Sequence, residues 1–171
     1  MLFLVVPLLS VLIPLVHLFV SKRPRTRQRI VELMLLYALV LNVGVIGVFL
    51  GFIPHVFFAD QTARLIGWAP GSPFQYEVGI HDAAWGLLGF LCLWMRGSFW
   101  IATGLGWAVF NFAAAYGHLR DALVEGNHAP YNVLPMFSDA FIAAWLLVLV
   151  CLYCRWCWKR ERPLGEAREI S

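Results

Sequence analysis

The sequence predicts an all-α integral membrane bundle of five transmembrane helices, with a short interfacial helix in one loop. Three observations support this prediction. Of the 171 residues, 61% are hydrophobic and only 13% are charged, whereas soluble domains are about 45–50% apolar and about 25% charged. Five stretches approach the roughly 20 apolar residues that a helix needs to cross the hydrocarbon core. The basic residues also gather on one side of these stretches, as expected for a membrane protein.

The predicted spans follow one another with mostly short connections. No basic segment precedes the first span and no small-residue cleavage site follows it, so we interpret it as a retained helix rather than a signal peptide. The second span carries Glu32 near its start. A single membrane domain, residues 1–171, contains all five spans and a basic tail: 2–20, 30–53, 75–95, 99–118, 131–154 and the tail 155–171.

Lysine and arginine predict the orientation, because loops rich in these residues stay in the cytoplasm. Only Arg64 and Arg120 lie on the opposite side from the others. Five spans place the N-terminus outside and the C-terminus in the cytoplasm. We interpret the basic segments as topology signals that also touch lipid headgroups, not as nucleic-acid sites. The eleven residues on the cytoplasmic side are Lys22, Arg23, Arg25, Arg27, Arg29, Arg96, Arg155, Lys159, Arg160, Arg162 and Arg168.

Three cysteines recur at every third position at the end of the fifth span: Cys151, Cys154 and Cys157. This spacing drifts around a helix, and no fourth ligand is evident. Packing near the membrane surface, with S-palmitoylation in a suitable host, is therefore favoured over metal binding.

The long loop 52–74 combines aromatic and polar residues. Phe57, Phe58 and Trp68 are interleaved with polar side chains, which indicates a short helix lying in the interface as a lid over the bundle. The Pro-Gly-Ser-Pro segment 70–73 predicts a turn before the third span.

Ionisable residues inside a membrane are costly, so each needs a partner, water or a purpose. Glu77 and His81 are four residues apart and share one face of the third span. His118 ends the fourth span, and Asp139 lies roughly 12 Å into the fifth. We expect a polar pocket that opens outward between these three spans. The candidate residues are Glu77, His81, His118 and Asp139, and the secondary candidates are Asp82, Asn111, Asp121 and His128.

Three functions fit these residues, and the sequence selects no enzymatic reaction. A divalent metal such as zinc, iron or copper would suit such ligands; haem between His81 and His118 is a less favoured variant. Carboxylates and histidines at this depth are also typical of proton or solute paths. We therefore predict a pocket that binds a cation, either a metal or a proton, for redox or transport work.

The third function involves no site at all. The same side chains could pair with one another and with Arg120 inside an accessory or scaffold subunit of a membrane complex. The expected partners are the lipid bilayer and either a second copy of the chain or a larger membrane complex, with no nucleic acid.

Two segments carry a resemblance. The run 66–79, IGWAPGSPFQYEVG, and the segment from Ala115-Tyr116-Gly117-His118 through Gly126-Asn127 and Ala129-Pro130 to Asp139 resemble a family of small multi-pass prokaryotic membrane proteins without assigned function. The resemblance covers about half the chain. It implies a bacterial or archaeal inner membrane and a helical bundle loosely like the DoxX type, and it places Glu77, His118 and Asp139 in the most family-like segments. The run 128–131, His-Ala-Pro-Tyr, departs from the more glycine-rich turn of that pattern.

Overall fold

The computed structural model describes residues 2–158, and every regular element in that range is helical. The all-α prediction is thus confirmed for the described residues. The basic tail residues Lys159, Arg160, Arg162 and Arg168 lie outside them. In chain order the elements are α1 (Leu2–Val20), α2 (Arg27–Ala38), η1 (Leu39–Phe52), α3 (Ile53–Phe57), α4 (Ala59–Ile66), α5 (Phe74–Leu91), α6 (Ser98–Val124), α7 (Pro130–Tyr153) and η2 (Cys154–Trp158), where η marks π-helix.

Four helices among the described residues are long and apolar enough to cross a membrane: Leu2–Val20, Arg27–Phe57, Ser98–Val124 and Pro130–Cys157. The predicted span 75–95 corresponds to α5, which has 18 residues. It falls outside this set because Glu77, His81 and Asp82 lower its hydropathy. The structure therefore supports four of the five predicted spans by length and composition.

Two helices extend well past their predicted ranges, and the last span continues to Cys157 instead of ending at residue 154. The second runs without interruption from Arg27 to Phe57. Its start is capped by the Thr26 side chain, which accepts a hydrogen bond from the Arg29 amide. Pro54 lies where the π-helical stretch η1 passes into α3. The other, α6, continues past the predicted end at residue 118 to Val124. The helix ends just before Gly126, whose φ of 70° is left-handed and does not continue an α-helix.

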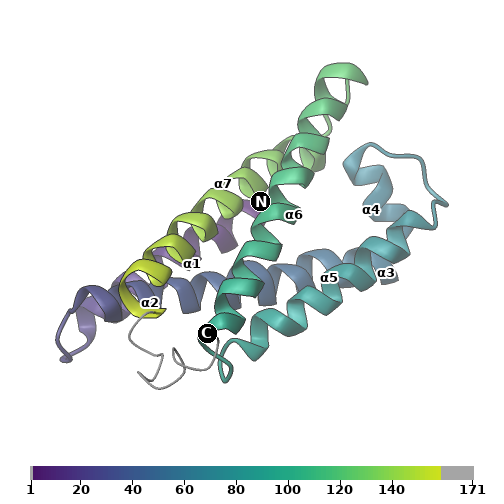
Figure 1. Ribbon diagram of the computed structural model, residues 1–171. Helices are drawn as coiled ribbons and strands as arrows, with labels where there is room; N and C mark the ends of the chain where they lie inside the picture. The colour runs from purple at the N-terminus through teal and green to yellow at the C-terminus, as the bar shows by residue number, and fades with distance from the viewer. Residues whose placement is uncertain (1, 159–171) are drawn as a thin grey trace, which may run out of the picture.

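The helices form two pairs with α1 packed against both (Figure 1). One pair is α6 and α7, joined by a short connection. The other is η1 and α5, and α5 then leads into α6 through the turn at 92–97. The α4 helix lies at one end of the molecule, between the far end of α6 and the α5 helix (Figure 1). We call this the α4 end. The opposite end, which carries the connection between α1 and α2, is the basic end.

Glycines bring η1 and α5 into backbone contact. A Cβ added to Gly89 would collide with the backbone of Gly44, and one added to Gly47 would lie 3.0 Å from the Cα of Gly86. Small residues permit such close approach between apolar helices, where packing rather than water exclusion holds them together. This pairing fixes α5, the most polar long helix, against the side of η1.

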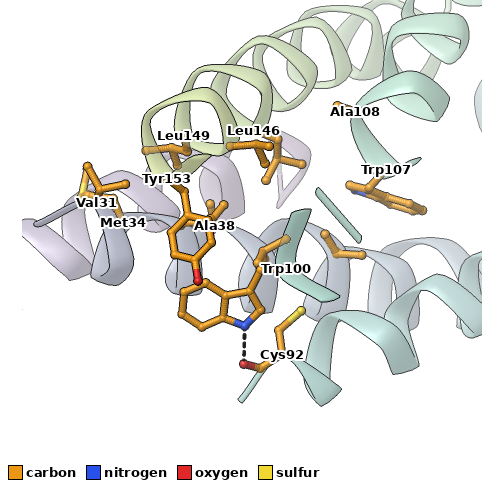
Figure 2. Close-up of a cluster of buried hydrophobic side chains, with 14 of the residues drawn as sticks. Val31, Met34, Ala38, Cys92, Trp100, Trp107, Ala108, Leu146, Leu149 and Tyr153 are labelled. Carbon is orange, nitrogen blue, oxygen red and sulfur yellow. Dashed lines mark hydrogen bonds between the residues drawn. The ribbon is translucent and has the colours of Figure 1, made fainter. Parts of the chain in front are cut away.

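The apolar core lies toward the basic end and is built around Trp100, Leu146 and Tyr153 (Figure 2). Leu35 and Leu39 contribute from the second helix and are fully buried. Trp100 donates a 2.8 Å hydrogen bond from Nε1 to the carbonyl of Cys92. The indole thereby satisfies its one donor while anchoring the α5–α6 turn.

Candidate functional site

The site lies at the α4 end, where His118 of α6 meets Asp139 of α7. The Nε2 atom of His118 is 3.9 Å from Oδ2 of Asp139, and the two side chains are only 15% and 18% exposed. Both residues were predicted as site residues, and the structure brings them together. Asp139 also has Ser138 as a neighbour, whose hydroxyl oxygen is 3.4 Å from its Oδ1 atom.

Asn132 determines which nitrogen of His118 carries a proton. Its amide nitrogen donates to two carbonyl oxygens, those of Asn127 at 2.8 Å and His118 at 3.2 Å. The amide orientation is therefore fixed, and its Oδ1 atom faces Nδ1 of His118 at 2.7 Å. Because an amide oxygen only accepts, Nδ1 must be the donor. In a neutral imidazole, Nε2 then presents its lone pair toward the Asp139 carboxyl group.

The turn after α4 brings Trp68 onto His118. The ring of Trp68 stacks on the ring of His118, with 6.4 Å between centroids and 12° between planes. Its Nε1 donates to Asp121 at 3.1 Å. Asn127 donates both to the same carboxylate, at 2.7 Å, and to the carbonyl of Ile66, at 2.8 Å. These contacts cover one face of His118 and tie α4 to the α6–α7 connection.

A second histidine–aspartate pair lies on α5. His81 donates from Nδ1 to Oδ1 of Asp82 at 3.0 Å, and its ring packs against Phe110 of α6 with 4.4 Å between centroids. Asp82 is buried. Its carboxyl group lies directly over Gly51 of η1, where any Cβ would collide with it.

The α3 helix adds a further polar side chain at the α4 end, that of His55. Nδ1 of His55 lies 2.6 Å from Oε1 of Gln75, and Gln75 is buried. Gln75 and Asp82 are thus two buried polar side chains on α5 at the α4 end.

The other candidate residues lie apart from the two histidine–aspartate pairs. Glu77 and His128 are exposed, and Asn111 is buried but donates only to the carbonyl of Trp107, one turn back along its own helix. Phe57 and Phe58 are exposed and line an open cleft beside α4 instead of covering His118. Of the predicted lid residues, only Trp68 contacts the site.

A metal centre finds little support in this arrangement. Within residues 2–158, no group of three or more histidine, cysteine, aspartate or glutamate side chains could hold a metal ion. The two rings considered for haem lie in different surroundings, since His81 packs against Phe110 and Trp107 while His118 is engaged by Asn132 and Trp68. Arg120 pairs with Glu125 at 3.8 Å, and both side chains are 58% exposed. It does not neutralise the candidate carboxylates.

Sequence reasoning missed the amides. Asn132, Asn127 and Gln75 hold the site together, yet each is an uncharged residue near a helix end. A signal was present in Asn132, which is polar, lies in the first turn of an apolar helix and follows Pro130. Such a residue is either exposed or engaged by a specific partner.

Several helices among the described residues are apolar and long enough to span a membrane, which suggests a helical membrane protein. The chain belongs to a family of unknown function (DUF6790), whose model matches residues 1–160. No curated protein and no solved structure matches it. The DoxX-type likeness expected from the sequence therefore receives no support from the comparisons.

Proposed function

We propose that this protein is a five-span inner-membrane protein that binds a proton between His118 and Asp139, as the external part of a proton relay or proton-coupled transport site. The observation on which this rests is the hydrogen bond from His118 to Asn132. It directs the unprotonated side of a neutral imidazole toward a carboxyl group.

Two acceptors facing each other need a proton between them. If His118 is neutral and Asp139 ionised, a lone pair faces a carboxylate at 3.9 Å in a largely buried site, which is unfavourable. One added proton removes the conflict, because it gives either an imidazolium beside a carboxylate or a carboxylic acid that donates to Nε2. The pair therefore favours binding one proton that the two residues share.

A second buried carboxyl group at the α4 end is that of Asp82 on α5. With His81 at its side, Asp82 offers a second proton-binding pair.

The fifth span in this proposal is α5. Its 18 residues extend about 27 Å at 1.5 Å per residue, close to the roughly 30 Å of a hydrocarbon core. Of its polar side chains, Asp82 is turned toward η1 at Gly51 rather than outward. Five spans then place the α4 end outside and the basic end in the cytoplasm, in agreement with the bias of Lys and Arg.

A proton is favoured over a metal because the site offers two ligands. Zinc or iron centres use at least three protein ligands, and none of the described residues completes such a set around His118 and Asp139.

Proteoliposomes containing a trapped pH-sensitive dye test the proposal. A potassium gradient with valinomycin would drive proton entry, and we expect acidification above that of protein-free vesicles. Asp139→Asn and His118→Ala should each abolish the difference. Glu125→Gln is the matched control, because it removes an exposed carboxylate at the same end of the molecule.

A second measurement reads proton binding without transport. Trp68 lies against His118, and a protonated imidazole quenches indole fluorescence. The fluorescence of Trp68 is obtained as the difference between wild type and Trp68→Phe. This difference should fall on acidification, and the fall should be absent when His118→Gln is introduced. If neither flux nor quenching depends on these residues, the accessory or scaffold role becomes the better explanation.

A further inference from the structure

A polar cleft lies at the basic end, at the opposite end of the molecule from the His118 site. Its volume is about 360 Å³. Three arginines from separate segments line it: Arg23 before α2, Arg29 within α2 and Arg96 in the α5–α6 turn. The remaining lining residues are His17, Glu32, Leu33, Leu36 and Trp100.

The charge of this cleft is positive and largely uncompensated. Three guanidinium groups face one carboxylate, that of Glu32, which leaves a formal charge of +2. Among the described residues, no carboxylate lies within 4.0 Å of Arg23, Arg29 or Arg96. Unpaired guanidinium groups that converge in a cleft favour an anion with several oxygen atoms, such as a phosphate group.

Two of the arginines are held in place before any ligand arrives. Arg29 donates to the carbonyl of Arg23 at 2.7 Å and to the hydroxyl of Ser21 at 2.6 Å. The guanidinium carbon of Arg96 lies over the ring of Trp100, 5.3 Å from its centroid. Trp100 is itself fixed by its hydrogen bond to Cys92, as Figure 2 shows. Side chains that are already ordered lose little entropy when they bind.

We propose that this cleft binds the phosphate group of an anionic ligand, either a phospholipid headgroup or a soluble phosphate ester. The walls favour the lipid, because Leu33 and Leu36 give the cleft an apolar side below the arginines. Basic clefts between membrane helices at the cytoplasmic surface bind anionic headgroups in this manner. The proposal goes beyond the topology signal, since that signal requires positive charge on one side but no shared cleft.

Native mass spectrometry of the detergent-solubilised full chain, titrated with phosphatidylglycerol or phosphatidylcholine, is the test. Loss of one charged hydrogen-bonding group should weaken phosphatidylglycerol binding by about tenfold or more. We expect this for Arg96→Gln and for Arg23→Gln, whose side chains make no hydrogen bond to other described residues. Arg27→Gln is the matched control, because it removes the same charge from the same region without lining the cleft. Size-exclusion profiles establish that each variant is folded.

Glycerol 3-phosphate distinguishes the two sources. If it displaces phosphatidylglycerol weakly or not at all, the site takes a lipid. If it binds alone in neutral detergent and loses affinity in Arg96→Gln, the ligand is a soluble phosphate ester. The proposal is overturned if phosphatidylglycerol binds no better than phosphatidylcholine and glycerol phosphate does not bind. Equal weakening by Arg27→Gln and Arg96→Gln would also overturn it.

Discussion

Asn132 allows a quantitative test of how the His118 site is held together. Asn132→Ala would remove three hydrogen bonds, to His118 Nδ1 and to the carbonyls of His118 and Asn127. The residue is fully buried, so water cannot replace these partners without rearrangement. Leaving a buried polar group unsatisfied costs about 1–3 kcal/mol. With incomplete additivity, we expect a loss of about 3–5 kcal/mol in the free energy of unfolding.

Asn111→Ala is the control for this prediction. Asn111 is also buried, but its side chain donates one hydrogen bond, to the carbonyl of Trp107 at 2.8 Å. Its loss should cost about 1 kcal/mol. Thermal unfolding in detergent, followed by circular dichroism, compares the two variants, and about 2–4 °C per kcal/mol is expected for a chain of this size. A melting temperature for Asn132→Ala equal to or above that of Asn111→Ala would show that the Asn132 network does not hold the site.

Two further predictions concern glycine packing and the lid. Gly89→Ala would drive a Cβ into the backbone of Gly44 and should destabilise the protein by about 1–3 kcal/mol or more. Gly117→Ala places its Cβ in open space within α6 and should stabilise the protein by about 0.5–1 kcal/mol. Urea or thermal unfolding measures both changes, and reversed signs would contradict the close packing of η1 and α5. Trp68→Phe keeps a ring over His118 but loses the hydrogen bond to the Asp121 carboxylate. Amide exchange across α4 should then become about tenfold faster, and unchanged exchange would mean that this bond does not hold the lid.

Hydropathy was sufficient to predict the apolar helices but not their ends. The second helix begins at Arg27, three residues before its predicted start, because Thr26 caps a turn that is itself polar. At its other end the helix continues past its predicted end at residue 53 to Phe57 and includes Pro54. The ends of membrane helices extend beyond the apolar segment, so the hydrophobic pattern predicts where a helix crosses and not where it stops.

Charge in the sequence identified two residues that the structure brings together, but it did not show which way each helix face turns. His118 and Asp139 stood out because ionisable groups are rare among apolar residues. Glu77 stood out for the same reason, but it lies on the exposed side of α5. Spacing along one helix shows which residues share a face, whereas the direction of that face depends on the Gly44–Gly89 contact with another helix. That contact could not be read from either helix alone.

The Trp68 lid and the proposed proton site share one hydrogen-bonded network. Trp68 is bonded to Asp121, Asp121 to Asn127, Asn127 to Asn132, and Asn132 to His118. Opening the lid would therefore disturb the contact that determines the tautomer of His118, as well as uncover the ring. If the proposed proton site is correct, lid position and proton affinity must influence each other to the same extent, since such coupling is reciprocal. Trp68→Phe should then shift the pH at which the proton flux changes. A flux with an unaltered pH profile would show that the lid and the proposed proton site are not coupled.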